Sequence, residues 1–176
     1  MHWAARQKNE YFINYLLNSD TKKMVNCRNH NGFTPLHFAC AKVNVRAAEA
    51  LLIAGACPNS PNIYDATPLH WLFSASCKDK NQAANKIELF KLIILAMDEE
   101  MLYNNFLKKN KIGYTPLHWV IITEDNLLFN ELIEFSPARR AILMLGDSFY
   151  SFLASRKAHF RNGALTEMKK TIKTLK

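Results

Sequence analysis

Thr34-Pro35-Leu36-His37 is a tetrapeptide motif that this chain of 176 residues contains three times. It returns as Thr67-Pro68-Leu69-His70 and as Thr115-Pro116-Leu117-His118. The first two copies are 33 residues apart, and the third follows after 48, which is one more period with 15 residues inserted. Threonine is favoured as a helix N-cap and proline at the first helical position, so each copy predicts the start of a helix. A fixed period of this length indicates stacked repeats.

The first complete unit extends this match beyond four letters. It runs Asn29-His30-Asn31-Gly32-Phe33-Thr34-Pro35-Leu36-His37-Phe38-Ala39-Cys40 and later Ala50-Leu51-Leu52-Ile53-Ala54-Gly55-Ala56, without a gap. This resembles the ankyrin repeat, whose unit reads D-x-x-G-x-T-P-L-H-x-A-A and then L-L-x-x-G-A. The resemblance implies an all-α solenoid of helix–turn–helix repeats with β-turn or hairpin tips. Gly32 is expected to take the positive φ of the tight turn, and Gly55 a left-handed C-cap.

The resemblance also divides the chain. Residues 1–135 are expected to form the repeat domain, with a partial repeat at 1–28 and repeats at 29–61, 62–109 and 110–135. In the family, the motif histidine forms hydrogen bonds locally and to the neighbouring repeat, which implies the same role for His37, His70 and His118. His2-Trp3-Ala4-Ala5 aligns with H-x-A-A, so the partial repeat lacks its turn and its Thr-Pro.

Two of the repeats depart from the family pattern. Val43 stands where glycine usually separates the two helices, and Asp65 replaces the glycine of the second turn. Leu72 and Phe73 replace a small pair, which predicts a displaced inner helix or a compensating gap. Residues 74–86 are rich in Lys and Asn, and we expect them to form an exposed interhelical loop, followed by an outer helix at 87–96. An acidic start and a basic stop predict a short extra helix near 99–107.

The last repeat and the segment after it carry further helix signals. The inner helix of the last repeat is expected at 116–122 and the outer helix at 126–135. Residues 136–176 contain no further motif and are expected to form a helical cap, because a repeat array needs atypical terminal units. Helices are predicted at 138–145 and 148–160, separated by Gly146. Leu165, Met168, Ile172 and Leu175 predict a third helix with lysines on its other face.

The net charge of +8 is concentrated after the repeats. Residues 1–135 hold 14 basic and 13 acidic side chains, whereas residues 136–176 hold 9 basic and 2 acidic ones. The basic third helix has three interpretations: a cap with its lysines in water, a site for an acidic protein or anionic membrane, or a nucleic-acid contact. The first is favoured, and nucleic acid is the weakest because nothing resembles a nucleic-acid module.

The apolar runs, the N-terminal residues and the cysteines indicate where in the cell the protein is expected. No apolar run approaches the length of a membrane-spanning helix, and no cleaved secretory signal is visible at the N-terminus. The four cysteines fit a reducing compartment. We therefore expect the protein in the cytoplasm, or in the cytosol of a host cell if it is a secreted effector.

In the family, contacts with a partner often come from the turns and from the exposed face of the inner helix. Carried over to this chain, the candidate partner-binding residues are His30, Asn31, Phe33, Ile63, Tyr64, Lys111, Ile112 and Tyr114. Three of them are aromatic, and exposed aromatic side chains are typical interface anchors. They could equally pack against the adjacent turn, and exposure of all three would favour the interface.

The sequence gives little support for an aromatic cage, a zinc site or a catalytic site. Trp3, Trp71 and Trp119 each follow a motif histidine, and this shared position is interpreted as core rather than as an aromatic cage. Cys27-x-x-His30 and His37-x-x-Cys40 mimic zinc half-sites, but His37 and Cys40 already have repeat positions. No catalytic or nucleotide-binding motif occurs. We expect no enzyme activity, no cofactor, no metal site and no small-molecule substrate.

The predicted function is therefore recognition of another protein through the concave face and the turn tips. The irregular repeats and the Lys/Asn/Ile-rich composition are similar to ankyrin-repeat effectors that intracellular bacteria or large DNA viruses deploy inside eukaryotic cells. That likeness predicts a host protein as the partner. Two alternatives stay open: a targeting arm of a larger enzyme, and binding of an anionic membrane or an acidic partner by the basic C-terminal helix.

Overall fold

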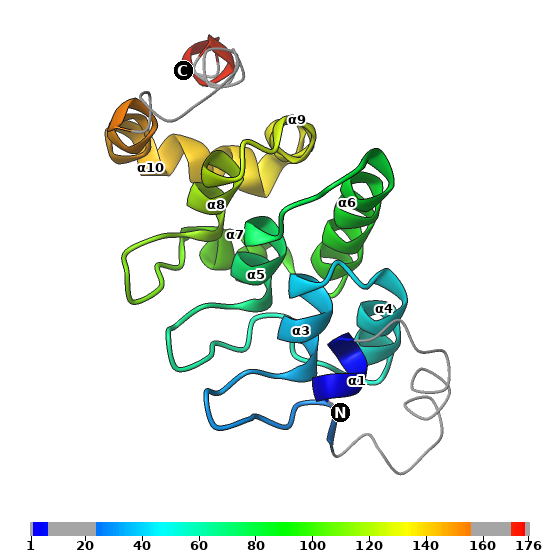
Figure 1. Cartoon of the computed structure of the whole chain (residues 1–176). Helices are drawn as coiled ribbons and strands as arrows, with labels where there is room; N and C mark the ends of the chain where they lie inside the picture. Colours follow the sequence, from blue (N-terminus) through cyan, green and yellow to red (C-terminus); the bar gives the residue numbers. More distant parts are fainter. Residues whose placement is uncertain (1, 7–23, 156–169, 175–176) are drawn as a thin grey trace.

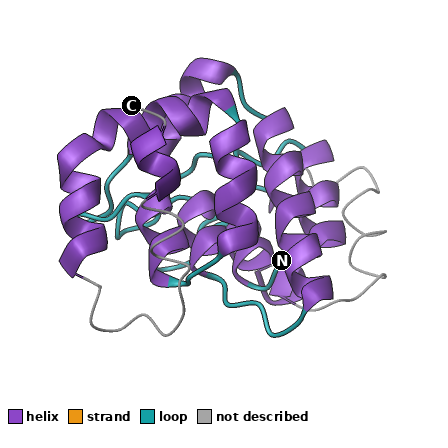
Figure 2. Ribbon diagram, turned by 90° about the horizontal axis from the view of Figure 1, so that it is seen from above, coloured by secondary structure: helices purple, strands orange, loops and turns teal. Residues whose placement is uncertain are grey.

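Two parallel rows of helices build the part of the chain that the computed structural model describes, which is residues 2–6, 24–155 and 170–174. The inner row is α1 (His2–Arg6), α3 (Pro35–Ala41), α5 (Pro68–Ser74) and α8 (Pro116–Ile122), and each helix packs on the next. The outer row is α4 (Val45–Ile53), α6 (Lys80–Leu95) and α9 (Asn126–Glu134). Figure 1 shows the long connections before α3, α5 and α8 projecting on the same side. All regular structure in the described residues is helical (Figure 2).

The inner helices begin where the motif predicts. Thr34, Thr67 and Thr115 are extended N-caps, and a proline opens each helix. The outer helices and the extra helix begin at polar N-caps whose side chains accept a backbone N–H three residues later. These caps are Asn44, Asp79, Asp98 and Asp125. Each cap satisfies one of the N–H groups that a helix start leaves without a partner.

Each projecting turn is closed by an asparagine. The Oδ1 atom of Asn29 accepts hydrogen bonds from the backbone N–H groups of Asn31 and Phe33, each at 3.0 Å. Asn62 and Asn110 do the same for the residues two and four positions on, at 2.9–3.2 Å. Successive turns are also joined to one another, because Ile63 donates to the carbonyl of Asn31 at 3.1 Å and Lys111 to that of Tyr64 at 2.9 Å. The turn tips therefore form a continuous, ordered ledge.

Replacement of Gly32 by alanine should be far more damaging than the same change at Gly113. Both residues have positive φ, +73° and +83°, so both changes strain the backbone. A Cβ on Gly32 would also lie 3.0 Å from the backbone nitrogen of Ile63 in the next turn, whereas nothing lies within 4 Å at Gly113. We expect a loss of about 3 kcal/mol for Gly32→Ala and about 1 kcal/mol for Gly113→Ala in urea unfolding. Equal losses would contradict this account of the ledge.

The two non-glycine residues that stand at glycine positions of the repeat adopt a positive backbone φ. Val43 (φ +50°) and Asp65 (φ +58°) both adopt the left-handed conformation that glycine would take at these positions. Gly55 (φ +90°) follows α4 as expected. The connection between α3 and α4 therefore contains a left-handed Val43 followed directly by the N-cap Asn44.

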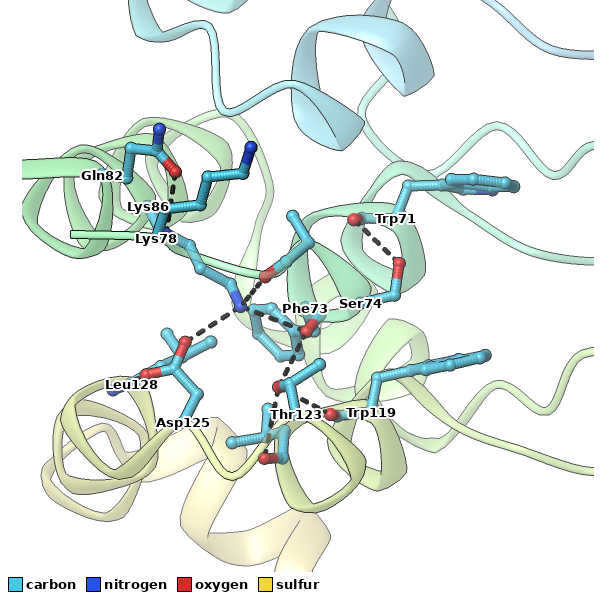
Figure 3. A network of polar contacts seen from close by, with 12 residues as sticks. Trp71, Phe73, Ser74, Lys78, Gln82, Lys86, Trp119, Thr123, Asp125 and Leu128 are labelled. Carbon is cyan, nitrogen blue, oxygen red and sulfur yellow. Dashed lines mark hydrogen bonds and ion pairs between the residues drawn. The ribbon is translucent and has the colours of Figure 1, made fainter.

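The predicted exposed loop at residues 74–86 is wrong over its second half. Helix α6 begins at Lys80, so the last turns of that segment are helical, and only residues 75–79 connect α5 to α6. Lys86 is moreover buried, with 1% of its side chain exposed. Its Nζ atom donates to the carbonyls of Phe73 and Ala75, at 3.1 and 2.8 Å, and lies 2.9 Å from the carboxylate of Asp125 (Figure 3). The positive charge therefore joins the end of α5, helix α6 and the start of α9.

The bulky pair Leu72-Phe73 is accommodated by the inserted helix. The predicted extra helix is confirmed as α7 (Glu99–Leu107). Its Phe106 lies against Phe73 of α5 and Phe90 of α6, with ring centroids 6.3 Å apart in both pairs. Asn105 of α7 is also buried and accepts a hydrogen bond from the hydroxyl of Thr67 at 2.8 Å. Helix α7 thus fills the space that a larger inner-helix residue opens.

The last helix covers the end of the array. Helix α10 (Ser136–Ser155) packs against α7, α8 and α9, and the guanidinium of Arg140 lies 4.3 Å from the ring centre of Tyr103. Gly146 (φ +46°) interrupts it, as expected between the two predicted helices. Residues 170–174 are helical and Ile172 is buried. Most of the partial repeat, the end of the helix predicted at 148–160, and Leu165, Met168 and Leu175 lie outside the described residues. The division into domains stays a prediction.

Candidate partner-binding site

The motif histidines link each inner helix to the next turn. The backbone N–H of Thr34 donates to Nδ1 of His37 at 3.0 Å, so this nitrogen carries no proton, and Nε2 donates to the carbonyl of Ala66 at 3.0 Å. His70 repeats the pattern, with Tyr114 as the acceptor at 3.1 Å. His2 lies 2.7 Å from the carbonyl of Phe33. Every acceptor directly precedes a motif threonine, so the role expected from the resemblance is confirmed for His37 and His70.

The last motif histidine faces the terminal helix instead. Nδ1 of His118 accepts from the backbone of Thr115 at 3.1 Å, as in the other repeats. Its ring packs against Phe149 and Phe152 of α10, with centroids 5.4 and 4.7 Å away. Helix α10 therefore occupies the place of a following repeat.

Burial keeps these histidines neutral. It lowers the pKa of His37, of His70 and of His118 from the ordinary 6.5 to about 4. Smaller contributions that lower the same pKa values come from neighbouring positive charges, which are Arg28 at His37, Lys108 at His70 and Lys109 at His118. No acidic side chain contributes to any of the three values. The row of histidines thus lies in a locally positive environment.

A groove of about 550 Å³ lies between the second and third turns and is also lined by residues of α5 and α8. Tyr64 lines one wall and Lys111 with Ile112 the other, and Trp71 and Trp119 line it from the two helices. In Figure 3 the two indole side chains extend side by side in the same direction from neighbouring helices. A mainly apolar groove of this size, with a few polar groups at its edge, is typical of a preformed binding site.

Three of the eight predicted contact residues line the groove, and they are Tyr64, Lys111 and Ile112. His30, Asn31 and Ile63 are exposed on the turn tips, outside the groove. Phe33 and Tyr114 are partly buried, and both pack against residues that line the groove. Phe33 contacts Trp71 and Tyr64 at 5.0 and 6.5 Å between ring centroids, and Tyr114 contacts Trp119 at 6.0 Å.

The three turn aromatics therefore do not share one environment. Tyr64 is 49% exposed, whereas Phe33 and Tyr114 support the groove from behind. The condition that would have favoured the interface, exposure of all three, is not met. Packing against neighbouring side chains is the better description of Phe33 and Tyr114, and Tyr64 alone stays an exposed aromatic candidate.

The assignment of the tryptophans to the core holds only in part for Trp71 and Trp119, because both pack against the core but also reach the surface. Both are partly exposed and line the groove, and the indole N–H of Trp71 has no hydrogen-bond partner among the described residues. The side chain of Trp3 lies outside the described part. The signal was present in the motif: a residue that follows the buried histidine is turned about 100° around the helix, away from the buried face. Ser74, three residues after Trp71, shares this face and also lines the groove.

The zinc half-sites are not assembled in the described residues. Both ring nitrogens of His37 are used in hydrogen bonds, and Cys40 is fully buried, which raises the pKa of its thiol. No group of three or more His, Cys, Asp or Glu side chains suited to a metal occurs in residues 2–6, 24–155 and 170–174. Within those ranges, no helix has the length and apolar character that crossing a membrane requires.

The stacked helix pairs, the joined turn tips and the linking histidines define a helical repeat array of the solenoid class. Residues 1–83 match the family model described as ankyrin repeats (three copies), so this stretch consists of ankyrin repeats. A search of the curated proteins found no match to the chain. The third motif, at 115–118, lies outside the matched residues. Its helix α8 stacks on α5 and its turn repeats the asparagine and histidine contacts, so the array continues through it.

Proposed function

We propose that the chain binds another protein through the groove and the ledge of turn tips next to it. Ankyrin repeats are general protein–protein interaction modules and are typically non-catalytic. The observation that supports this site is the row of exposed apolar side chains on the ledge. Ile63, Tyr64 and Ile112 are 45%, 49% and 65% exposed. Apolar side chains that stay exposed next to a groove mark interaction surfaces.

The ledge is suited to binding because it is ordered before a partner arrives. Its turns are held by asparagine side chains and joined by backbone hydrogen bonds, so little conformational entropy remains to be lost. In this proposal His30, Asn31 and Lys111 supply polar contacts. Phe33 and Tyr114 hold the tryptophans of the groove in place. The partner contacts the ledge and the groove together.

An affinity capture experiment tests this proposal. The bait is the full chain, and the test variant replaces Ile63, Tyr64 and Ile112 by serine. The control is Leu95→Ser, because Leu95 is also apolar, is 83% exposed and ends the outer helix α6. We expect at least one protein to be captured by the native chain and the control, and to be reduced about tenfold or more with the triple variant. Equal capture by all three folded baits would contradict the proposed site.

The composition supports a narrower form of the proposal, in which the partner is a protein of a host cell. The same baits would then capture the partner from a eukaryotic lysate and not from a bacterial lysate. A partner that depends on Ile63, Tyr64 and Ile112 but comes only from the bacterial lysate would contradict the effector role. It would leave the binding site itself in place.

A further inference from the structure

We propose that the groove takes an acidic peptide segment of the partner and that one large apolar side chain of this segment lies between Trp71 and Ile112. This inference rests on the proposed function and makes it specific, because it names the place of the anchor and the charge around it. The inference depends on two features of the groove, its apolar interior and the basic wall beside it. Described residues form both features.

The interior suits an apolar anchor. Two indole rings from α5 and α8 and the side chains of Tyr64 and Ile112 surround the groove, and the rings are held from behind by Phe33 and Tyr114. Aromatic surfaces that are fixed by packing contribute strongly to an interface because they lose little freedom on binding. Ile112 is 65% exposed, so this surface is in water until an apolar group covers it.

The wall next to the interior is positively charged. The connection from α7 to α8 carries Lys108, Lys109 and Lys111 and no acidic residue between positions 108 and 114. Lys109 and Lys111 are exposed, and neither forms an ion pair with a residue that the structure describes. The opposite turn contributes Asp65 as its one acidic residue. Complementary charge steers a partner and sets its orientation, so the wall favours carboxylates.

The charge of the chain argues against two other occupants. In a symmetric dimer that joins two grooves, the two basic walls would face each other and bring like charges together. The segment after the repeats has 9 basic and 2 acidic residues, so it is also repelled by the lysines. An acidic segment of a different protein is the occupant that satisfies both the apolar interior and the wall.

Selection from a random twelve-residue peptide library displayed on phage, with the full chain as target, tests the inference. Enriched peptides are then synthesised and their dissociation constants are measured by fluorescence polarisation. The variant Y64S/I112S removes two apolar side chains of the groove, both of them exposed. The variant K109E/K111E reverses the charge of the basic wall. The control is K78E/K80E, because these exposed lysines lie in the connection from α5 to α6 and at the start of α6, where they line a separate hollow. Circular dichroism confirms that each variant is folded.

The expected peptides carry a net negative charge and a Leu, Phe or Trp. Their dissociation constants should rise about tenfold or more with Y64S/I112S and with K109E/K111E, and stay unchanged with K78E/K80E. Replacement of the anchor in the peptide by serine should have the same effect as Y64S/I112S. Basic or neutral peptides, binding that survives both groove variants, or no enrichment at all would overturn the inference.

Three further outcomes distinguish a failure of this inference from a failure of the proposed function. Peptides that lose affinity with His30→Ser and Ile63→Ser but not with the groove variants would overturn the binding of an acidic peptide in the groove and leave the ledge as the binding site. Peptides indifferent to every one of these substitutions would contradict both. A dimer in sedimentation velocity that dissociates with Y64S/I112S would show that a second copy fills the groove, and would also overturn the inference.

Discussion

Replacement of Lys86 by methionine should lower the free energy of unfolding by about 3–5 kcal/mol, the usual loss when one partner of a buried ion pair is removed. The ammonium group is held by two backbone carbonyls at the end of α5 and by Asp125 at 2.9 Å. Methionine fills similar space but leaves the carbonyl of Ala75 and the carboxylate of Asp125 without the ammonium donor. The carbonyl of Phe73 keeps only the longer hydrogen bond from the hydroxyl of Thr123, at 3.4 Å. Urea unfolding followed by circular dichroism measures the loss.

The matched control is Lys91→Met. Lys91 lies on α6, like Lys86, and its ammonium group pairs with Glu131 of α9 at 3.3 Å. In contrast to Lys86, 57% of the Lys91 side chain is exposed. An exposed pair of this kind contributes at most about 1 kcal/mol. If the two substitutions cost the same, Lys86 does not have the role assigned to it.

A double-mutant cycle isolates the charge pair. Asp125→Asn keeps the Oδ1 atom that caps α9 through the N–H of Leu128 at 3.0 Å, and replaces the charged Oδ2 that faces Lys86 by an NH2 group, which cannot accept from the ammonium. We expect the combined variant K86M/D125N to lose less stability than the sum of the single losses, with a coupling of about 1–3 kcal/mol. Strict additivity would mean that the contact between the two side chains contributes little.

Mild acid should destabilise the array strongly, because two neutral histidines are buried between repeats. His37 and His70 have folded-state pKa values of about 4, against 6.5 when the chain is unfolded. Above pH 6.5 both states hold the rings neutral and the stability is fully present. Between pH 6.5 and 4 the unfolded chain binds protons that the folded chain does not, so stability falls with pH. At pH 5 the two sites together account for a loss of about 4 kcal/mol.

Substitution of one histidine should flatten this profile. His37→Gln is expected to be less stable at pH 7, because hydrogen bonds to Thr34 and Ala66 are lost or weakened. It should lose about a third of the pH dependence between pH 7 and 5, because His70 and His118 keep their lowered pKa values. His30→Gln is the control, since the ring of His30 is exposed. The measurement is urea unfolding at a series of pH values. A native chain whose stability is unchanged between pH 7 and 5 would contradict the buried neutral state.

The elements that follow from local rules could be predicted from the sequence. The Thr-Pro starts, the acidic start of α7 and the glycine break in α10 each depend on a cap or on backbone freedom, which a short stretch specifies. The histidine links to the next repeat came from the family resemblance, and the structure places them as implied. The effector role and the cytoplasmic location stay predictions from the sequence.

The features that sequence reasoning missed depend on packing between repeats. Lys86 looked like part of a solvated basic loop, although it precedes Leu89, Phe90 and Ile93 by three, four and seven residues and so shares their buried stripe. A lysine is tolerated at this buried position because two backbone carbonyls at the end of α5 and the carboxylate of Asp125 bind its ammonium group. These groups come from other parts of the chain, so no local sequence pattern reveals them. Trp71 and Trp119 pack against the core as expected, but their contribution to the groove was missed because the direction of this position around the helix was not considered.

Site-specific photo-crosslinking tests the central claim, that a partner binds at the groove and ledge, most directly. Benzoylphenylalanine is placed at Ile112 on the groove wall, at Ile63 on the ledge, or at Leu95 on the outer helix, all exposed positions. The full chain is then irradiated in eukaryotic lysate. We predict one common crosslinked protein for positions 112 and 63 and none for position 95. Crosslinking from position 95 alone would place the binding surface on the outer helices and contradict the account.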